Sequence, residues 1–388
     1  MAFDIAVVTE TFPPEVNGVA MTLGRLVDGM RQRGHRVRVV RPRQGRADAG
    51  GECELALPGL PLPGYPGLRF GLPAGRSLLR EWRLQPPDLV HVVTEGPLGW
   101  SAVAAARRLG IPVTSSFHTN FERYSVHYGL GWLRPVVAAY LRILHRRTKL
   151  TMVPTEALAA EMAGAGIAGV RVVGRGVDTR LFDPARCSAA LRAAWGVPEG
   201  GLACLYVGRM AAEKNLALVG KAFAAIQRER PDARLVWVGD GPAAAGLRQA
   251  HPGQHFAGVR LGEELAAHYA SADLFLFPSL SETYGNVVAE AMASGLPVLA
   301  YRSAAAAELI RDGLNGRQVP AGDEALYIAA ARELARADVP HLRELAEAAR
   351  LSMLPRNWAH VVERFEAVLA EAMDHPDFRP AATSGAAC

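Results

Sequence analysis

The residues with the clearest potential for chemistry lie in FPSLSETYGNVVAEAMASGLPVLA, residues 277–300. Glu282 and Glu290 are eight positions apart, and we expect the first in a loop at a strand's end and the second in the following helix. Asn286 lies four positions before Glu290, so the two share a helix face. Free amides of the first turn, around Val287, would attract an anion such as a diphosphate. One carboxylate could then bind sugar hydroxyls and the other a ribose; the alternative is a loop carboxylate and a solvated helical glutamate.

A second group is GRMAAEKN, residues 208–215, which follows the apolar run Leu202–Val207. Arg209 and Lys214 bracket a short loop that we expect at the strand's carboxyl end. Two fixed cations there suit a diphosphate leaving group, because negative charge builds on it as a glycosidic bond breaks. The alternative is two solvated basic residues in a loop.

The first half of the chain offers two further candidates. Gly18, in the loop TETFPPEVNGVA, would let the backbone approach a phosphate closely. The loop is not a G-x-G-x-x-G fingerprint and no suitable acidic residue follows, so dinucleotide binding and an oxidoreductase are disfavoured. His118 follows the apolar run Pro112–Ser115 and would face a cleft at the strand's end, although a lone histidine is more often structural.

The sequence predicts neither a metal nor a cofactor. It has no D-x-D pair, which argues against a metal-held diphosphate. None of the four cysteines belongs to a C-x-x-C pair or lies near a histidine cluster, so we expect neither a zinc site nor a disulfide framework. Cysteines without such pairing fit the reducing cytoplasm. We recognise no signal peptide and no apolar run long enough to span a bilayer, so we expect a cytoplasmic protein.

Short apolar runs such as Ile5–Val8 and Leu274–Phe277 alternate with helical patterns along the whole chain. This rhythm is typical of α/β proteins whose parallel sheets are covered on both faces. Both halves open with an apolar strand, a glycine-bearing loop and a helix. We therefore predict two Rossmann-like, doubly wound domains that face each other across a cleft, with ligands beyond the carboxyl ends of the strands.

We place the domain boundary where GRGVDTRLFDP interrupts the periodicity. Residues 1–176 would form an acceptor-side domain, and residues 177–356 a domain that binds a nucleotide sugar. A helix over 357–375 could cross back to the first domain. Residues 376–388 are predicted to be a disordered tail.

Several motifs occur in an order that resembles the retaining glycosyltransferases of family four, which have the GT-B fold. They span roughly residues 3–373 and comprise the Gly18 loop, His118, RGVDTRLF, GRMAAEKN, VGDGP and SETYGNVVAEAMASGLPV. In that family the sugar's anomeric configuration is kept and the leaving phosphate deprotonates the acceptor, so no protein nucleophile is expected. One departure is SAAAAELI, residues 303–310, where the family usually has a glycine pair; this argues against sugar contacts from that loop.

The resemblance also implies a role for each candidate residue. Three would hold the diphosphate: Gly18, Arg209 and Lys214. Two would act at the donor sugar as catalytic residues, His118 and Glu282. Glu290 would bind the ribose, with Asn286 and Val287 beside it in the nucleotide site.

Within the family, TETFPPEVNGVAMTL and ETYGNVVAEAMASGLPV most resemble GDP-mannose-dependent α-mannosyltransferases. We therefore expect transfer of a hexose, mannose from GDP-mannose, to a lipid or glycan hydroxyl. Two alternatives stay open. One is a UDP-sugar-dependent glycolipid transferase, glucosyl or sulfoquinovosyl. The other is a nucleotide-sugar-binding protein without activity, because a fold alone proves no chemistry.

The net charge of +5 favours anionic partners. Residues 130–149 read as a helix with an apolar stripe that includes Leu133 and Leu144, and a basic stripe of Arg142, His145, Arg146 and Lys149. Such a helix could lie on the anionic inner face of the cell membrane, and the alternative is a packed Rossmann helix with a solvated basic face. The basic residues lack the interleaved aromatics of nucleic-acid binding, which we do not expect.

Overall fold

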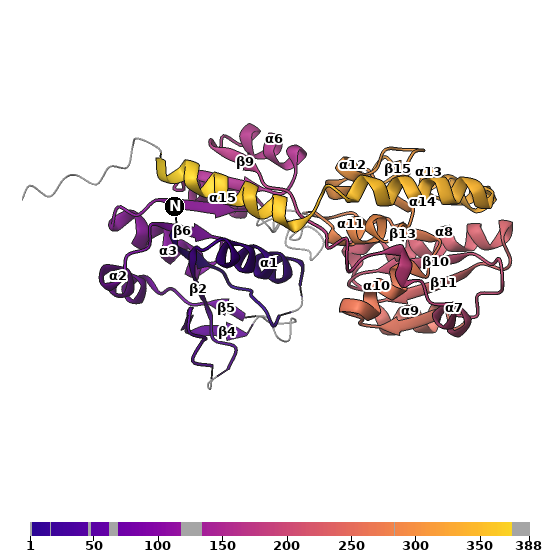
Figure 1. Ribbon diagram of the computed structural model, residues 1–388, viewed down its shortest axis with the longest axis horizontal. Helices are drawn as coiled ribbons and strands as arrows, with labels where there is room; N and C mark the ends of the chain where they lie inside the picture. Colours follow the sequence, from indigo (N-terminus) through magenta and orange to yellow (C-terminus); the bar gives the residue numbers. More distant parts are fainter. Residues whose placement is uncertain are drawn as a thin grey trace, which may run out of the picture. The chain divides into compact units, whose positions relative to one another are not determined.

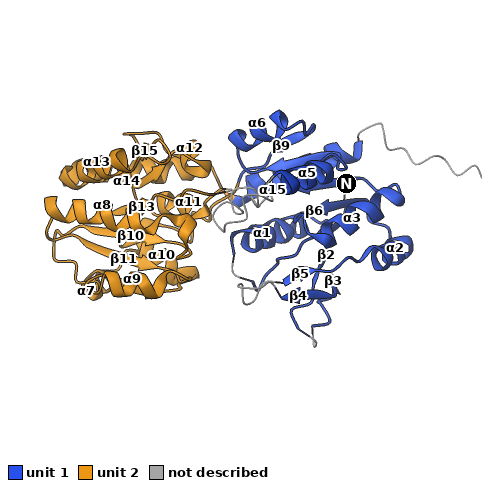
Figure 2. Ribbon diagram, turned by 180° about the vertical axis from the view of Figure 1, so that it is seen from behind, with its two compact units in different colours: residues 1–122, 132–174, 358–388 blue, residues 123–131, 175–357 orange. Residues whose placement is uncertain are grey.

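The computed structural model describes residues 2–15, 17–45, 48–61, 69–117, 134–282 and 284–374, which fall into two compact units (Figure 2). Unit 1 holds the described residues within 1–122, 132–174 and 358–388. Unit 2 holds those within 175–357. The division at residues 174 and 175 lies two positions before the predicted one.

Unit 1 is built on a parallel sheet, and its helices flank that sheet (Figure 1). In the described residues the strand order is β3-β2-β1-β6-β7-β8-β9. The strands are β1 (Asp4–Val8), β2 (Arg36–Pro42), β3 (Glu54–Leu57), β6 (Leu89–Val92), β7 (Val113–Ser116), β8 (Leu150–Val153) and β9 (Val170–Val172). The helices are α1 (Gly18–Gln32), α2 (Gly75–Leu84), α3 (Pro97–Arg108), α5 (Arg134–His145), α6 (Glu156–Gly164) and α15 (Trp358–Asp374). A separate antiparallel pair joins β4 (Gly59–Pro61) to β5 (Arg69–Gly71).

The period-two alternation of β1 explains why both faces of this sheet are covered. Ile5 and Val7 are buried in one core cluster with α1 and α15, whereas Ala6 and Val8 are buried in another with α2 and α3. Successive side chains of a strand point to opposite faces, so a wholly apolar strand needs helices on both sides.

Unit 2 repeats this plan with its own parallel sheet and core. The described strands have the order β12-β11-β10-β13-β14-β15. They are β10 (Ala203–Val207), β11 (Arg234–Val238), β12 (His255–Gly258), β13 (Leu274–Phe277), β14 (Val298–Tyr301) and β15 (Gly316–Val319). Counted within the unit this is 3-2-1-4-5-6, the Rossmann order, in which a crevice opens where the order reverses, between β10 and β13.

Helices cover both faces of the second sheet. The short 3-10 segments are η2 (Pro184–Arg186) and η3 (Ala212–Lys214), and the α-helices are α7 (Ala189–Ala194), α8 (Leu216–Glu229), α9 (Ala244–Ala250), α10 (Gly262–Ala270), α11 (Asn286–Ala293), α12 (Ala304–Leu309), α13 (Glu324–Arg336) and α14 (Val339–Met353). Throughout the described residues of both units, we find no helix with the length and apolar character needed to cross a bilayer.

The helix predicted over 130–149 is α5, which ends at His145, and residues 130–133 lie outside the described part. The prediction of His145 on a solvated basic stripe is wrong. Its side chain is fully buried, and its Nδ1 is 2.9 Å from Ser115 Oγ. Arg146 donates to the Gly166 carbonyl and Lys149 to the Ala372 carbonyl, so the end of the predicted stripe is tied to the rest of unit 1.

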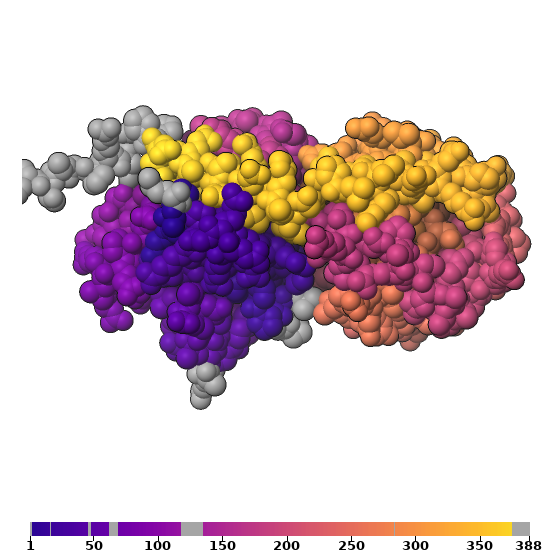
Figure 3. All heavy atoms as spheres, in the orientation of Figure 1, coloured from indigo at the N-terminus to yellow at the C-terminus, as the bar shows by residue number. Residues whose placement is uncertain are grey.

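The chain returns to unit 1 through α15, which follows the last residue of unit 2. Its buried side chains follow a three- and four-residue spacing: Val361, Val362, Phe365, Val368, Leu369 and Ala372. They pack against α1 so closely that a Cβ added at Gly29 would lie 2.4 Å from Val362 Cγ2. Figure 3 shows the yellow residues of α15 lying against the indigo residues of unit 1.

We predict that Phe365→Ala destabilises unit 1 by about 3–5 kcal/mol, because the ring is 3% exposed and its loss leaves a cavity between α15 and the sheet. Urea-induced unfolding, followed by circular dichroism, measures the change. The control is Glu363→Ala on the exposed side of α15. A change below about 1 kcal/mol for Phe365→Ala would mean that α15 contributes little to this core.

Candidate active site

Glycines bring two loops of unit 2 into direct backbone contact. A Cβ at Gly239 would lie 2.1 Å from the Gly208 carbonyl oxygen, and one at Gly241 would lie 2.4 Å from that of Met210. The Met210 amide also donates to the Asp240 carbonyl at 2.8 Å. The VGDGP motif after β11 therefore packs against the loop after β10, and this contact fixes the backbone position of Arg209.

The loop after β10 and the loop after β13 form one site at the crevice. Lys214 Nζ makes an ion pair with Glu282 Oε1, and both side chains are largely buried. The Leu280 amide donates to the Glu213 carbonyl at 3.1 Å, which joins the two loops through their backbones. The structure thus brings together Lys214 and Glu282, with Arg209 on the same short loop.

The helix after β13 begins with an uncapped end. Gly285 has a φ of 90°, a left-handed conformation that glycine adopts without strain, and α11 starts at the next residue. No side chain among the described residues caps this end. Asn286 and Val287, the first residues of α11, therefore present backbone amides of the kind that bind anions.

Glu290 lies one turn into α11, where Tyr269 Oη donates to its Oε2 at 3.0 Å. Burial raises the pKa of Glu290 to about 7, although the Tyr269 hydrogen bond opposes the rise. A carboxyl with this pKa is close to half-ionised at neutral pH, so a ligand that needs its charged form must compete with a proton.

In unit 1 the loop that carries Gly18 is closed by a helix cap. Asn17 Oδ1 accepts hydrogen bonds from the amides of Val19 at 3.1 Å and Ala20 at 2.9 Å, and Gly18 is the first residue of α1. These two amides are therefore occupied by the protein itself. The role of Gly18 under a phosphate stays a prediction.

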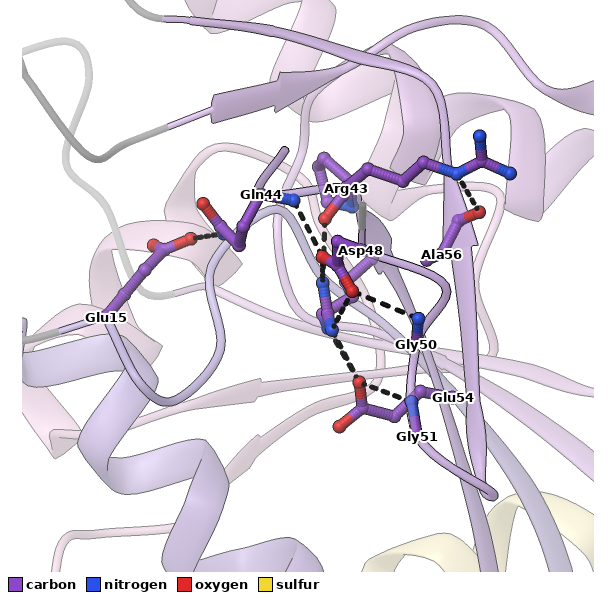
Figure 4. Close-up of polar contacts among 10 residues, drawn as sticks. Glu15, Arg43, Gln44, Asp48, Gly50, Gly51, Glu54 and Ala56 are labelled. Atoms are coloured by element: carbon purple, nitrogen blue, oxygen red, sulfur yellow. Dashed lines mark hydrogen bonds and ion pairs between the residues drawn. The ribbon is translucent and has the colours of Figure 1, made fainter. Parts of the chain in front are cut away.

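A polar network supports the same loop from the side (Figure 4). Glu15 accepts a hydrogen bond from the Gln44 side chain, and the Gln44 amide donates to Asp48. Arg41 makes ion pairs with Asp48 and Glu54, and this guanidinium holds the pKa of Asp48 well below its usual range. The loop is thus held by a charged cluster at Glu15 as well as by Phe12, which is buried in the apolar core of unit 1.

The sequence interpretation missed two carboxylates at the switch point of unit 1. Glu10 follows β1 and Glu95 follows β6, where the strand order of the sheet reverses. Burial raises the pKa of Glu10 to about 7, and neither oxygen of Glu95 has a hydrogen-bond partner among the described residues. A Cβ at Gly96 would lie 2.0 Å from Glu10 Oε1. The sequence could have indicated both carboxylates, since a Thr-Glu pair directly follows an apolar run at Glu10 and at Glu95.

Two other predictions concern His118 and the segment SAAAAELI. His118 lies outside the described residues, so its position stays a prediction. In SAAAAELI, Ala304 has a φ of 47°, and the Ala305 amide donates to the Tyr284 carbonyl at 2.8 Å. The alanine therefore takes the left-handed conformation that favours glycine, at a cost of about 1–2 kcal/mol. Within the described ranges no three His, Cys, Asp or Glu side chains gather as metal ligands.

Comparison with known proteins gives matches along most of the chain. The profile of Glycosyltransferase Family 4 matches residues 16–181, and that of Glycosyl transferases group 1 matches residues 201–338. The chain is 35% identical to a GDP-mannose-dependent alpha-mannosyltransferase of Mycobacterium tuberculosis over 92% of this chain and 94% of that protein. The chain belongs to glycosyltransferase family 4. The prediction of a glycosyltransferase from the order of its motifs is confirmed.

One further relative and one solved structure are more distant in sequence. Sulfoquinovosyl transferase SQD2 of Arabidopsis thaliana is 32% identical over 78% of this chain and 60% of its own length. The crystal structure of Anabaena HepE in complex with UDP matches with a TM-score of 0.76 at 18% identity, over 95% of this chain and all of that one. The predicted GT-B fold, with two Rossmann-like domains, is confirmed.

We predict that the affinity for a nucleoside diphosphate depends on the charge of Glu290. If ribose hydroxyls donate to its carboxylate, the ionised form binds, so affinity is lower below the pKa of about 7 and constant well above it. Binding should be about tenfold weaker at pH 6 than at pH 8. Titration calorimetry across this range measures it.

The matched control for this titration is Glu290→Gln, which cannot ionise at this position. It retains only the pH dependence of the nucleotide's own phosphates, which the comparison subtracts. Identical pH profiles for the wild type and Glu290→Gln would show that Glu290 does not bind the ribose as a carboxylate.

Proposed function

We propose that this protein is a retaining, metal-independent α-mannosyltransferase that moves mannose from GDP-mannose to a lipid or glycan hydroxyl. The observation that carries the proposal is the group of Arg209, Lys214 and Glu282 at the switch point of unit 2, next to the uncapped start of α11. It combines cations for a diphosphate with a carboxylate for sugar hydroxyls.

The chemistry follows from where charge develops. As the bond between sugar and diphosphate breaks, negative charge builds on the phosphate, and Arg209 and Lys214 would stabilise it without a metal ion. Lys214 must then exchange Glu282 for the phosphate, which leaves Glu282 to accept hydrogen bonds from the sugar. The leaving phosphate would take the acceptor's proton on the same face, so the anomeric configuration is retained.

A UDP-sugar-dependent glycolipid transferase is the second candidate. It is supported by the likeness to a sulfoquinovosyl transferase and by a match to a structure that contains UDP. The donor base distinguishes the two candidates, so competition between GDP and UDP decides between them. GDP-mannose is favoured because the mannosyltransferase matches more of this chain, 92% against 78%.

We predict that purified protein transfers mannose from GDP-mannose in excess chelator, and that Lys214→Ala lowers turnover by about 100-fold, roughly 3 kcal/mol of transition-state stabilisation. Release of GDP from a panel of nucleotide sugars is the measurement. The matched control is Lys221→Ala, whose exposed amine pairs with Glu324 on the same unit.

Each part of this prediction has its own contrary result. A strict requirement for added divalent metal would rule out the metal-free mechanism. Tighter binding of UDP than of GDP would favour the UDP-sugar enzyme. Near-normal kinetics in Lys214→Ala would remove this residue from the diphosphate site.

For a lipid acceptor we propose peripheral contact between unit 1 and the anionic inner face of the cell membrane. Arg76, Arg80 and Arg83 of α2 line one surface hollow together with Arg108 of α3 and two leucines, Leu79 and Leu84. Leu84 is 76% exposed. Such a basic and apolar surface suits phospholipid headgroups better than α5 and the residues after it, where Arg146 and Lys149 already bind carbonyls.

We predict that the wild type sediments with vesicles containing phosphatidylglycerol at low salt and not with phosphatidylcholine alone. Changing Arg76, Arg80 and Arg83 to Glu should abolish this, since each basic residue near an anionic surface contributes about 1 kcal/mol. High salt should weaken binding by screening. The control is Arg142→Glu on α5; a larger loss in this control would place the membrane contact on α5 instead.

A further inference from the structure

One buried carboxylate beside the diphosphate site has no role in the mechanism above. Glu213 lies on η3, between Arg209 and the start of α8, and it is 1% exposed. Neither of its carboxylate oxygens has a hydrogen-bond partner among the described residues. A buried carboxylate without hydrogen bonds is costly, and folds retain few of them. Its position therefore calls for a functional explanation.

The cation that faces Glu213 is a predicted diphosphate ligand. Arg209 Nη1 is 3.9 Å from Glu213 Oε1, and the Arg209 side chain is 34% exposed. Its guanidinium therefore lies between a buried carboxylate and the solvent. The other predicted cation, Lys214, pairs instead with Glu282. In the ligand-free site each cation thus has its own carboxylate, one deeply buried and one closer to the surface.

The backbone holds Glu213 in place. Its carbonyl accepts the Leu280 amide at 3.1 Å, and the Lys214 amide donates to the Ala211 carbonyl at 3.1 Å. Tyr206 Oη donates to the Arg209 carbonyl at 3.1 Å, which fixes the loop on its inner side. Burial raises the pKa of Tyr206 well above its usual value, and the charges of Glu282 and Glu213 add to this rise.

We propose that Glu213 is a positioning residue for the donor's diphosphate, a fixed buried charge that holds the Arg209 guanidinium where the leaving phosphate develops its charge. The proposal rests on the proposed function. Glu282 can turn from Lys214 toward a sugar, whereas a side chain as buried as Glu213 cannot leave its place. Arg209 would therefore be oriented before the donor binds, and charges set in place beforehand stabilise a transition state without reorganisation.

This role has a kinetic signature that a merely structural residue lacks. The negative charge of Glu213 offsets part of the attraction between Arg209 and any bound diphosphate. Removing that charge should leave the affinity for a nucleoside diphosphate equal or higher. Turnover should fall, because Arg209 loses its orientation in the transition state. A loss of folding would lower binding and turnover together.

The test is Glu213→Gln, which keeps the side chain's shape and removes its charge. We expect kcat to fall at least tenfold with GDP-mannose, while the dissociation constant for GDP, measured by calorimetry, stays within twofold or decreases. Glu324→Gln, a surface carboxylate of unit 2 that pairs with Lys221, is the matched control and should change neither. A kcat of Glu213→Gln within twofold of the wild type would overturn the proposal, as would a GDP affinity that falls in proportion to kcat.

A double-mutant cycle shows whether Glu213 acts through Arg209. In an Arg209→Lys background, Glu213→Gln should cause little further loss of kcat, because the group it positions has already changed. Full additivity of the two losses would contradict the proposal. If Glu213→Gln does not fold, Glu213→Asp replaces it, since it keeps the charge and moves it back by one methylene; we expect an intermediate kcat with unchanged GDP affinity, and wild-type kcat would count against the role.

The same measurements separate the two hypotheses. A wild type that binds neither GDP nor UDP would contradict the proposed function itself. If UDP binds in place of GDP, the cycle is run with UDP and the UDP-sugar that turns over. A wild type that binds and transfers, with Glu213→Gln indistinguishable from it, would contradict only the positioning role.

Discussion

The reversal of strand order between β10 and β13 is the constraint on which the site of unit 2 depends. The chain leaves these two neighbouring strands toward opposite sides of the sheet, so no crossover connection fills the space above their carboxyl ends. The loop after one strand carries Arg209 and Lys214, and the loop after the other carries Glu282. Their ion pair and the backbone bond from Leu280 to Glu213 follow from that adjacency. The backbone contact of Gly239 with Gly208 then fixes the position of the loop after β10 relative to the sheet.

The sequence was sufficient to predict the fold and the loops that lie at the carboxyl edge of the sheet. Apolar runs such as Leu274–Phe277 predicted the strands that are buried on both faces almost to the residue, because such a strand has no polar positions near its ends. Charged residues directly after such runs then identified the carboxyl edge of the sheet. Spacing could not show that Lys214 and Glu282 bind each other, or that Glu213 turns inward, because both depend on side-chain directions across loops that are distant in sequence. The prediction of His145 on the basic stripe was wrong for a related reason, since Ser115 on a neighbouring strand offers His145 a buried partner.

Both units place carboxylates at their switch points, but they satisfy them differently. In unit 2 the carboxylates Glu213 and Glu282 each face a cation. In unit 1, Glu95 lies 3.6 Å from His145 Nε2, and Gly96 makes room for Glu10. No basic side chain comparable to Lys214 pairs with Glu10 among the residues that the structure describes. The two halves thus share an architecture while differing in the charge they could offer a ligand.

The return of α15 to unit 1 also affects how the chain folds during synthesis. The described residues of unit 2 all lie within 175–357, whereas the core of unit 1 is completed only by side chains beyond residue 358. A ribosome therefore releases every residue of unit 2 before it supplies the helix that covers α1. Domains fold as units as the chain emerges. Unit 2 can consequently fold first although it comes second in the sequence, and the apolar side chains of α1 and β1 that pack against α15 stay exposed until that helix emerges.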